Sequence, residues 1–244
     1  MLELKNISFG AQSERGEKQI LKDISIKFNN GFIAITGPNG GGKSTLAKII
    51  AGIEKPTSGK ILLDGEDITE LSVTERAKRG ISFAFQQPVR FKGITVNDLI
   101  RLAAGRDITV SEACDYLSLV GLCARDYINR EVNASLSGGE LKRIEIATVL
   151  ARGTSVSIFD EPEAGIDLWS FSNLINVFER MRENLGGSII IISHQERILN
   201  IADKVAVISA GKLTAYDEKS AVLPELLDAS YDACKVLKKN VREV

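Results

Sequence analysis

Two stretches near the start of the chain largely alternate between apolar and polar residues. They cover residues 2–9 and 20–28, and the polar segment AQSERGEKQ separates them. Alternation with a period of two is typical of strands that bury one face. The pattern therefore predicts two half-buried strands, which we expect to pair antiparallel.

Other stretches are continuously apolar, which is typical of strands buried on both faces of a parallel sheet. FIAIT (32–36) ends in glycines and is followed by the helical pattern STLAKIIAGI, the strand-turn-helix order of an α/β sheet. Further strands are predicted at 81–85, 155–160, 188–193 and, as one strand, 204–213, and helices over 168–185 and from residue 219 onward. Residues 89–133 are mostly helical in pattern and predict a separate helical lobe.

Composition and charge argue against several classes of protein. The chain has 244 residues, of which 44% are hydrophobic and 26% charged, as in an ordinary globular protein. Its 31 basic and 32 acidic residues give a net charge of −1, so we expect no nucleic-acid partner. The apolar run at 189–192 is far shorter than the ~20 residues that span a bilayer, and MLELKNISF lacks the layout of a signal peptide. We expect a cytoplasmic protein.

Three cysteines are scattered along the chain, at Cys114, Cys123 and Cys234. Their odd number and the absence of a C-x-x-C pair argue against a disulfide framework or a self-contained zinc or cluster site. We interpret them as buried or incidental thiols.

The segment GPNGGGKST fits the phosphate-loop pattern G-x-x-x-x-G-K-[ST], and it lies between a predicted strand and a predicted helix as that pattern requires. Backbone amides of such a loop cradle phosphates, Lys43 would pair with β- and γ-phosphate oxygens, and the hydroxyl of Ser44 would bind Mg²⁺. The predicted nucleotide-binding residues here are Gly37, Pro38, Asn39, Gly40, Gly41, Gly42, Lys43, Ser44 and Thr45.

Polar residues follow two of the predicted buried strands. Asp160 and Glu161 end SVSIFDE, and beside a phosphate loop they could hold Mg²⁺ through its water shell and polarise an attacking water. Alone, this pair is equally compatible with a solvated turn. His194, the single histidine, follows SIIIIS and could donate to a γ-phosphate at the same sheet edge. Gln86, after strand 81–85, indicates no function by itself.

The turn LSGGE precedes the helical pattern ELKRIEIATVLAR. Ser137 and Glu140 fit a capping box, but that interpretation leaves Gly138 and Gly139 unexplained, because glycine costs roughly 1 kcal/mol in a helix relative to alanine. A helix N-terminus with bare amides binds anions, and the glycines suggest close approach of a phosphate. The phosphate loop lies far earlier in the chain, which raises the question of whose phosphate this turn binds.

The order of phosphate loop, Gln86, LSGGE, DE and His194 resembles the nucleotide-binding subunits of the ABC ATPase superfamily, over essentially residues 2–213. The resemblance implies a P-loop α/β core with an N-terminal antiparallel β subdomain and an inserted helical lobe at about 89–140. It implies an ATPase domain over 1–218, and the helical pattern that follows predicts a helical tail over 219–244. The implied ligands are ATP and Mg²⁺.

The resemblance also implies a role for each motif. Gln86 is the Q-loop glutamine, which takes part in catalysis and binds Mg²⁺ together with Ser44 and Asp160. Glu161 is the catalytic base and His194 the switch histidine. Two copies of the chain lie head to tail. The ATP bound by one copy is covered by residues of the other copy, namely Ser137, Gly138, Gly139, Glu140 and, in EAGID, Asp167. Family members stack adenine on an aromatic near the end of the first strand, where FGAQS offers only Phe9 here.

Local variations narrow the resemblance. FAFQQPVRFKGITVNDLIRLA, LSGGELKRIEI, EAGID and SHQERIL look like the SUF-system ATPase, SufC. The leading hypothesis is therefore an ATPase motor for a soluble iron–sulfur scaffold subunit of the SufB type. The alternative is the ATPase subunit of a membrane transporter, whose helical lobe binds a permease. The single cassette and balanced charge disfavour a regulatory or nucleic-acid-linked ABC protein.

Overall fold

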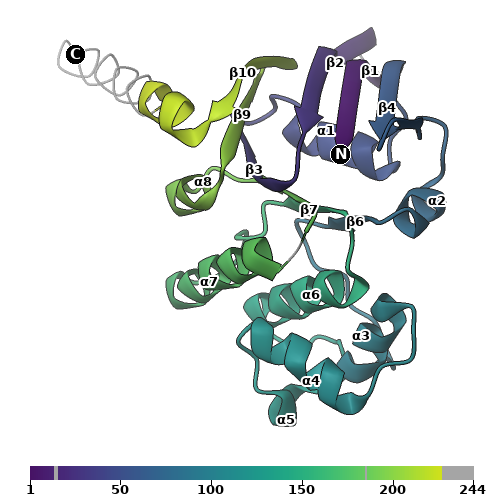
Figure 1. The fold of residues 1–244 in the computed structure, drawn as a ribbon, viewed down its shortest axis with the longest axis vertical. Coiled ribbons are helices and arrows are strands. Elements are labelled where there is room, and N and C mark those ends of the chain that lie inside the picture. Colours follow the sequence, from purple (N-terminus) through teal and green to yellow (C-terminus); the bar gives the residue numbers. More distant parts are fainter. Residues whose placement is uncertain (14–15, 185, 227–244) are drawn as a thin grey trace.

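Two sheets and a group of helices make up the fold of the computed structural model (Figure 1). The structure describes residues 1–13, 16–184 and 186–226. Residues 219–226 are helical, as the pattern predicts. The remainder of the predicted tail, with Cys234, lies outside the described residues.

The first sheet is antiparallel and has the strand order β2-β1-β4-β5. Its strands are β1 (Leu2–Ser13), β2 (Gly16–Phe28), β4 (Ser58–Leu63) and β5 (Glu66–Asp67). In β1 and β2, Leu4 pairs with Ile26 and Ile7 with Ile24, which confirms the predicted antiparallel pair. The sequence analysis misses β4 and β5, because in β4 only Ile61 and Leu63 are buried and the apolar signal is short.

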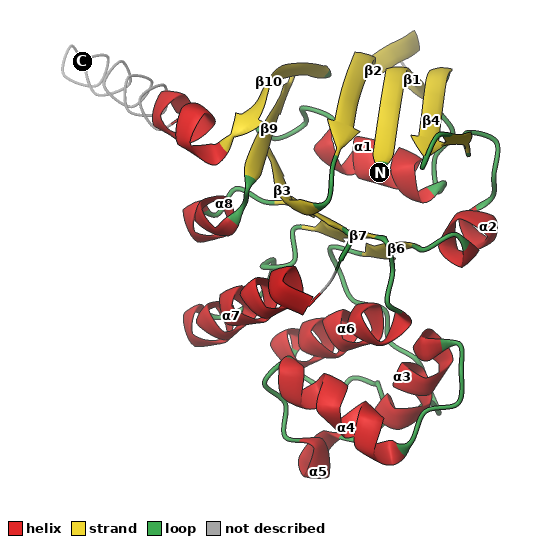
Figure 2. Ribbon diagram, in the orientation of Figure 1, coloured by secondary structure: helices red, strands yellow, loops and turns green. Residues whose placement is uncertain are grey.

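The second sheet has the order β10-β9-β3-β8-β7-β6 and is parallel except for β10 (Figure 2). Its strands are β3 (Gly31–Thr36), β6 (Ile81–Ala84), β7 (Val156–Asp160), β8 (Ser188–Ile192), β9 (Lys204–Ser209) and β10 (Lys212–Glu218). Alternate residues of the apolar runs pack into two different cores. Ile190 lies in the core that contains residues of β1 and β2, and Ile191 lies in the core that contains residues of the helical lobe. Burial on both faces explains why these strands read as continuous apolar runs.

The prediction of one strand over 204–213 is wrong. Residues 204–218 form the antiparallel hairpin of β9 and β10, in which Ser209 pairs with Lys212. Ala210 and Gly211 turn the chain with φ of 49° and 80°. Apolar residues continue on both sides of this turn, so the pattern alone does not mark where the chain reverses.

Helices cover both faces of the parallel sheet. They are α1 (Lys43–Ala51), α2 (Val73–Lys78), α3 (Val96–Ala104), α4 (Val110–Leu119), α5 (Ala124–Tyr127), α6 (Gly138–Arg152), α7 (Leu168–Asn184) and α8 (Glu196–Ile201). Helix α1 packs between the two sheets, where Leu46 and Ile50 are fully buried. Helices α3, α4 and α5 gather below α6 as the predicted helical lobe (Figure 1).

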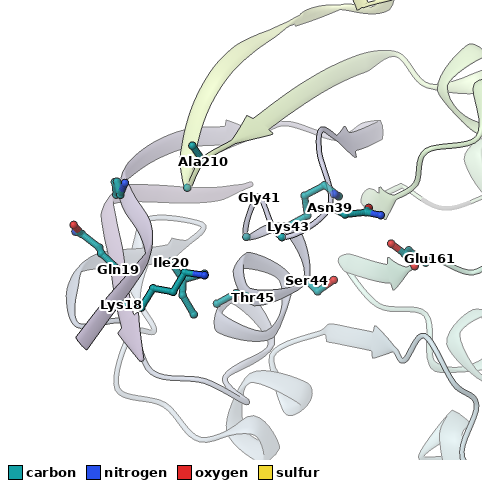
Figure 3. A pocket seen from close by; sticks show the side chains of 14 residues that line it. Lys18, Gln19, Ile20, Asn39, Gly41, Lys43, Ser44, Thr45, Glu161 and Ala210 are labelled. Carbon is teal, nitrogen blue, oxygen red and sulfur yellow. The ribbon is translucent and has the colours of Figure 1, made fainter. Parts of the chain in front are cut away.

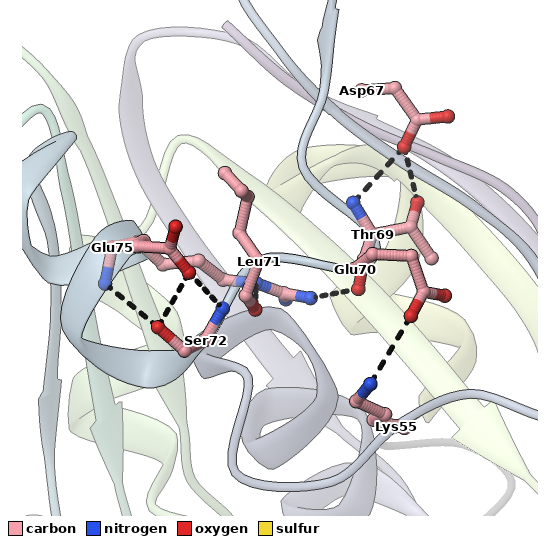
Figure 4. Close-up of polar contacts among 8 residues, drawn as sticks. Lys55, Asp67, Thr69, Glu70, Leu71, Ser72 and Glu75 are labelled. Carbon is pink, nitrogen blue, oxygen red and sulfur yellow. Dashed lines mark hydrogen bonds and ion pairs between the residues drawn. The ribbon is translucent and has the colours of Figure 1, made fainter.

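Local sequence signals set the ends of several helices. Ser72 and Glu75 form a capping box at the start of α2 (Figure 4), and Thr95 with Asp98 and Thr109 with Glu112 do the same for α3 and α4. Among the described residues, none of the helices combines the length and the apolar character that a bilayer crossing demands.

Candidate functional site

The phosphate loop joins β3 to α1 and packs against the backbone of β9. Gly37 has φ of 131°, and a Cβ there would lie 2.1 Å from the carbonyl oxygen of Ile208. Gly42 caps α1 with φ of 104° and offers no side-chain cap, and the first turn of α1 carries no acidic residue. These glycines therefore leave the amides at the start of α1 bare, which is the arrangement that binds a phosphate.

Lys43 is nearly buried at the first position of α1. Its ammonium group donates to the carbonyl oxygens of Gly37 (2.7 Å) and Pro38 (2.9 Å), so the loop folds around it. Burial lowers the pKa of Lys43, while the carboxylates of Glu161 and Asp160 oppose that shift. In the part of the chain that the structure describes, the hydrogen-bond partners of this cation are backbone oxygens alone, and two carboxylates lie close to it.

Asp160 ends β7 beside the first turn of α1. One of its oxygens accepts a hydrogen bond from the Ser44 hydroxyl at 2.9 Å, and the residue is only 5% exposed. Burial raises the pKa of Asp160; the Ser44 hydroxyl opposes the rise and the neighbouring Glu161 adds to it. A hydroxyl and a carboxylate in contact provide hard oxygen donors of the kind that Mg²⁺ prefers.

Glu161 is the point where three predicted site residues meet. Gln86 donates from its amide nitrogen to Glu161 Oε2 at 2.6 Å, and His194 Nε2 lies 3.8 Å from Glu161 Oε1. The backbone of Glu161 has φ of 45°, which is uncommon outside glycine, and its N–H donates to the carbonyl of Ile192 at 3.0 Å. Adjacent parallel strands end at the same edge, so this bond fixes the end of β7 to the end of β8.

A pocket of about 750 Å³ opens in front of the phosphate loop (Figure 3). Asn39, the residues from Gly40 to Thr45, and Glu161 line it. The sequence analysis misses the remainder of its wall, which is formed by Lys18, Gln19, Ile20, Lys22, Ala210 and Gly211. Phe9 packs on the core of the antiparallel sheet instead. The side chains of β2 reach the pocket through tertiary packing alone, for which the sequence carries no local signal.

The turn at 137–140 does not line this pocket. Its predicted capping box is confirmed: Ser137 accepts from the N–H of Glu140, and Glu140 accepts from the N–H of Ser137. Glu140 also accepts a hydrogen bond from Tyr127, which ties it to the lobe. Gly138 has ordinary surroundings, because a Cβ would lie 3.6 Å from the Gly165 oxygen. Asp167 is exposed ahead of α7, outside the pocket lining.

Glu163 is a further residue that the sequence analysis misses. It accepts a hydrogen bond from the Ser193 hydroxyl, one residue before His194, and its other oxygen is buried without a hydrogen-bond partner. Burial raises the pKa of Glu163, an effect that the Ser193 hydroxyl opposes. The contact joins the segment after Glu161 to the segment that carries His194.

Comparison with known proteins identifies the family. The family model described as ABC transporter matches residues 21–164, more than half of the chain. The chain belongs to the ABC ATPase superfamily. It is 40% identical over 208 residues to an ABC transporter ATP-binding protein of Methanocaldococcus jannaschii, covering 82% of this chain and 83% of that protein. It is 34% identical to a putative ABC transporter ATP-binding protein of Pyrococcus horikoshii, covering 100% of this chain and 98% of the relative.

Solved ABC cassettes share this fold. A dimeric cassette in a post-hydrolysis state, bound to ADP and Pi, superposes with a TM-score of 0.80 at 22% identity, covering 90% of this chain and 99% of that one. The predicted fold, an α/β core with an antiparallel β subdomain and a helical lobe, is confirmed. The predicted enzyme class, an ABC-type ATPase, is confirmed as well.

Proposed function

We propose that this chain is the ATP-binding and ATP-hydrolysing subunit of a machine that pairs two cassettes. One observation carries the proposal. The bare N-terminus of α1, the buried Lys43, the Ser44–Asp160 pair and the Glu161 carboxylate meet at the phosphate loop, at one end of one pocket. This is the set of groups that phosphoryl transfer to water needs.

The donors around the phosphate loop fit ATP with Mg²⁺. The loop amides and Lys43 would hold the phosphates, and the oxygens of Ser44 and Asp160, with Gln86 in reach of Glu161, would hold the metal. When bound, Mg²⁺ neutralises charge on the phosphate oxygens. The Ser44 and Asp160 side chains already touch, so this part of the site is formed in the chain itself.

Glu161 is placed to accept a proton from water. Its oxygens lie near Gln86 and His194. Gln86 donates a hydrogen bond to one oxygen of this carboxylate, and a carboxylate is a group that can act as a general base. His194 is in position to donate to a phosphate oxygen that lies beside Glu161.

A second copy of the chain would complete the site. The capping box at the start of α6 uses the N–H groups of Ser137 and Glu140 but not those of the two glycines between them, and this turn does not line the pocket of its own chain. None of the described residues around Gly138 requires a glycine there, since a Cβ would make only an ordinary contact. A phosphate of a head-to-tail partner explains both the exposure of the turn and its glycines.

The names of the relatives favour a membrane permease as the partner, because they are described as transporter ATP-binding proteins. An apolar groove of about 200 Å³ adjoins the segment after Gln86. It is lined by Phe83, Phe85, Pro88, Val89, Phe91, Leu99, Val132, Leu141, Ile144, Glu145 and Thr148. Among these, Phe85, Val89 and Phe91 are exposed large apolar side chains, which is typical of a surface that binds a partner.

A soluble iron–sulfur scaffold of the SufB type is the second candidate partner. The observation that favours it is local sequence: LSGGELKRIEI and EAGID resemble the SUF-system ATPase. Either partner would use the same groove beside the Q-loop, so the ATPase proposal holds for both.

The hydrolysis step is tested with Glu161→Gln. We expect turnover to fall about 10²- to 10⁴-fold, because the amide cannot take a proton, while ATP affinity stays near that of the wild type. Phosphate release and nucleotide binding are measured in parallel, with Glu179→Gln, an exposed position on α7, as the matched control. Turnover by Glu161→Gln at the wild-type rate contradicts the role of Glu161.

The partner is tested by co-purification from the native source, from both membrane and soluble fractions. We expect a permease in the membrane fraction; a soluble scaffold supports the second candidate instead. Phe91→Glu should reduce capture about 10-fold or more, because it places a charge in the apolar groove. Leu102→Glu is the control, since Leu102 is 70% exposed on α3 and does not line the groove. Equal capture by both variants places the partner elsewhere.

A further inference from the structure

Helix α6 carries a buried ion pair that neither the family motifs nor the ATP site explains. The ammonium group of Lys142 lies 2.8 Å from Glu145 Oε2, and the two side chains are only 2% and 17% exposed. Burial raises the pKa of Glu145, and Lys142 opposes that rise. Buried ion pairs contribute little net stability, because desolvation offsets their attraction. A structural reason alone therefore explains the pair poorly.

Both charges also bind one residue of another segment. The N–H of Phe85 donates to Glu145 Oε1 at 3.0 Å, and Lys142 donates to the carbonyl oxygen of Phe85. Strand β6 ends at Ala84, so Phe85 is the first residue beyond the sheet. The pair thus holds the N–H and the carbonyl of a residue that has no sheet partner. We call this arrangement the Phe85 clamp, formed by Lys142, Glu145 and the backbone of Phe85.

Phe85, the residue whose backbone the clamp holds, comes directly before Gln86 in the chain. Gln86 is exposed, and its amide donates to Glu161 at 2.6 Å. The ring of Phe85 meets that of Phe83 edge-on, with the two ring centroids 4.9 Å apart. The direction in which Gln86 leaves the sheet is therefore set by contacts with α6.

We propose that Lys142 and Glu145 are positioning residues that hold Gln86 against Glu161 and thereby link the orientation of α6 to the hydrolytic carboxylate. This inference rests on the proposed ATPase function. The clamp begins five residues after Ser137, or roughly 7.5 Å along the helix at 1.5 Å per residue. Movement of the N-terminus of α6 therefore moves Phe85 with it. Glu145 also lines the apolar groove, so an occupant of the groove touches the same device.

The test separates positioning from simple folding by removing the charges singly and together. Lys142→Met and Glu145→Gln each leave one buried charge and should be less stable to urea. The double variant removes both charges, and its free energy of unfolding should recover at least in part. We expect kcat for ATP hydrolysis to stay about 10- to 100-fold low in all three, with KM for ATP within about twofold, since the phosphate loop is untouched.

A double-mutant cycle with Gln86→Ala identifies the route. If the clamp acts through Gln86, the double clamp variant lowers kcat no further once Gln86 is alanine. Arg106→Ala with Glu112→Gln is the matched control, because this ion pair (3.0 Å) is exposed and lies on the lobe away from Gln86. It should leave kcat unchanged.

Two results overturn the inference. One is a wild-type kcat in the double clamp variant. The other is a fall in kcat on mutating the clamp that is as large in the Gln86→Ala protein as in the protein with Gln86. Failure of the proposed function itself is distinct, because it shows as an absence of Glu161-dependent turnover in the unmodified protein.

Discussion

His194 shows how the surroundings of one residue set its charge. It is the only histidine of the chain, and it lies between groups of opposite charge. Burial lowers the pKa of His194, the ammonium of Lys43 lowers it further, and Glu161 opposes both. The imidazole is therefore neutral at neutral pH. A neutral imidazole can donate from one nitrogen without adding a full charge beside Lys43.

We predict that the imidazole of His194 titrates below the ordinary histidine value of about 6.5. Because the folded state then binds fewer protons than the unfolded state between its own pKa and about 6.5, stability should fall as the pH drops through that window. Replacing Glu161 with Gln should lower the midpoint further, and replacing Lys43 with Met should raise it. Proton NMR of the protein without a histidine tag follows the titration of His194 alone, because the chain contains one histidine.

A midpoint above 6.5 in the wild type, or shifts of the opposite sign in the two variants, contradicts this electrostatic description. Thr45→Val is a control, since it lies in the same pocket and carries no charge.

The sequence predicts the residues at the strand ends well, for a simple reason. Asp160, Glu161 and His194 each follow a continuous apolar run, and the ends of parallel strands meet at one edge. Gln86 also follows an apolar strand, but only the family resemblance marked it as a site residue. Residues such as Ile20 and Lys142 could not be predicted, because a side chain on a half-buried strand or an amphipathic helix carries no local mark of its tertiary partner.

Among the helices, α1, whose N-terminus is proposed to bind phosphate, is held from its far end. Arg76 on α2 is 1% exposed and donates to the carbonyls of Ile49 (2.6 Å) and Ile50 (2.9 Å), near the C-terminus of α1. It also donates to the carbonyls of Leu71 and Thr69, in the segment drawn in Figure 4. A cation at this end complements the helix dipole, whose positive end faces the phosphate loop.

Arg76→Met should therefore destabilise the protein by roughly 2–4 kcal/mol, because it removes a buried donor shared by four carbonyls, of which that of Ile49 keeps the N–H of Gly52 as a second donor. At about 2–4 °C per kcal/mol for a chain of this size, the melting temperature should fall clearly. Arg79→Met is the matched control: it lies three residues later, pairs with Glu66 at 2.6 Å on the surface, and should change stability by less than ~1 kcal/mol. Urea unfolding measures both, and equal effects argue against the capping role.

Element boundaries depend on turns more than on apolar pattern. The sequence predicts the buried strands β3, β7 and β8 closely, because burial on both faces leaves little room for polar residues. It merges β9 and β10, because the one glycine of the turn, Gly211, lies between apolar stretches and the other residue of the turn, Ala210, adopts φ of 49° without being glycine or asparagine. Short strands such as β4 bury too few residues to stand out.

Across the whole molecule, the two features proposed to bind phosphate lie apart. The start of α6 is on the side of the helical lobe, and α1 packs under the antiparallel sheet (Figure 1). Ser137 and Gly138 are exposed, and the pocket at the phosphate loop contains neither. A site that needs both can form only between two copies. A two-fold arrangement uses each feature once per site and closes without leaving a free half.

The head-to-tail arrangement predicts complementation between two inactive variants. Lys43→Ala removes the cation of the phosphate loop, and Ser137→Arg blocks the turn, so each variant alone should hydrolyse almost no ATP. A mixed dimer contains one site with both features intact and one with both altered. If subunits mix at random and sites act independently, an equal mixture should recover about a quarter of the wild-type rate. Phosphate release is measured after mixing, and heterodimers are verified with two affinity tags.

Ala134→Arg is the control for Ser137→Arg, because it adds the same side chain at an exposed position three residues earlier and should stay active. Verified heterodimers without recovery contradict independent composite sites, and hydrolysis by Ser137→Arg alone contradicts a role for the turn in the partner's site.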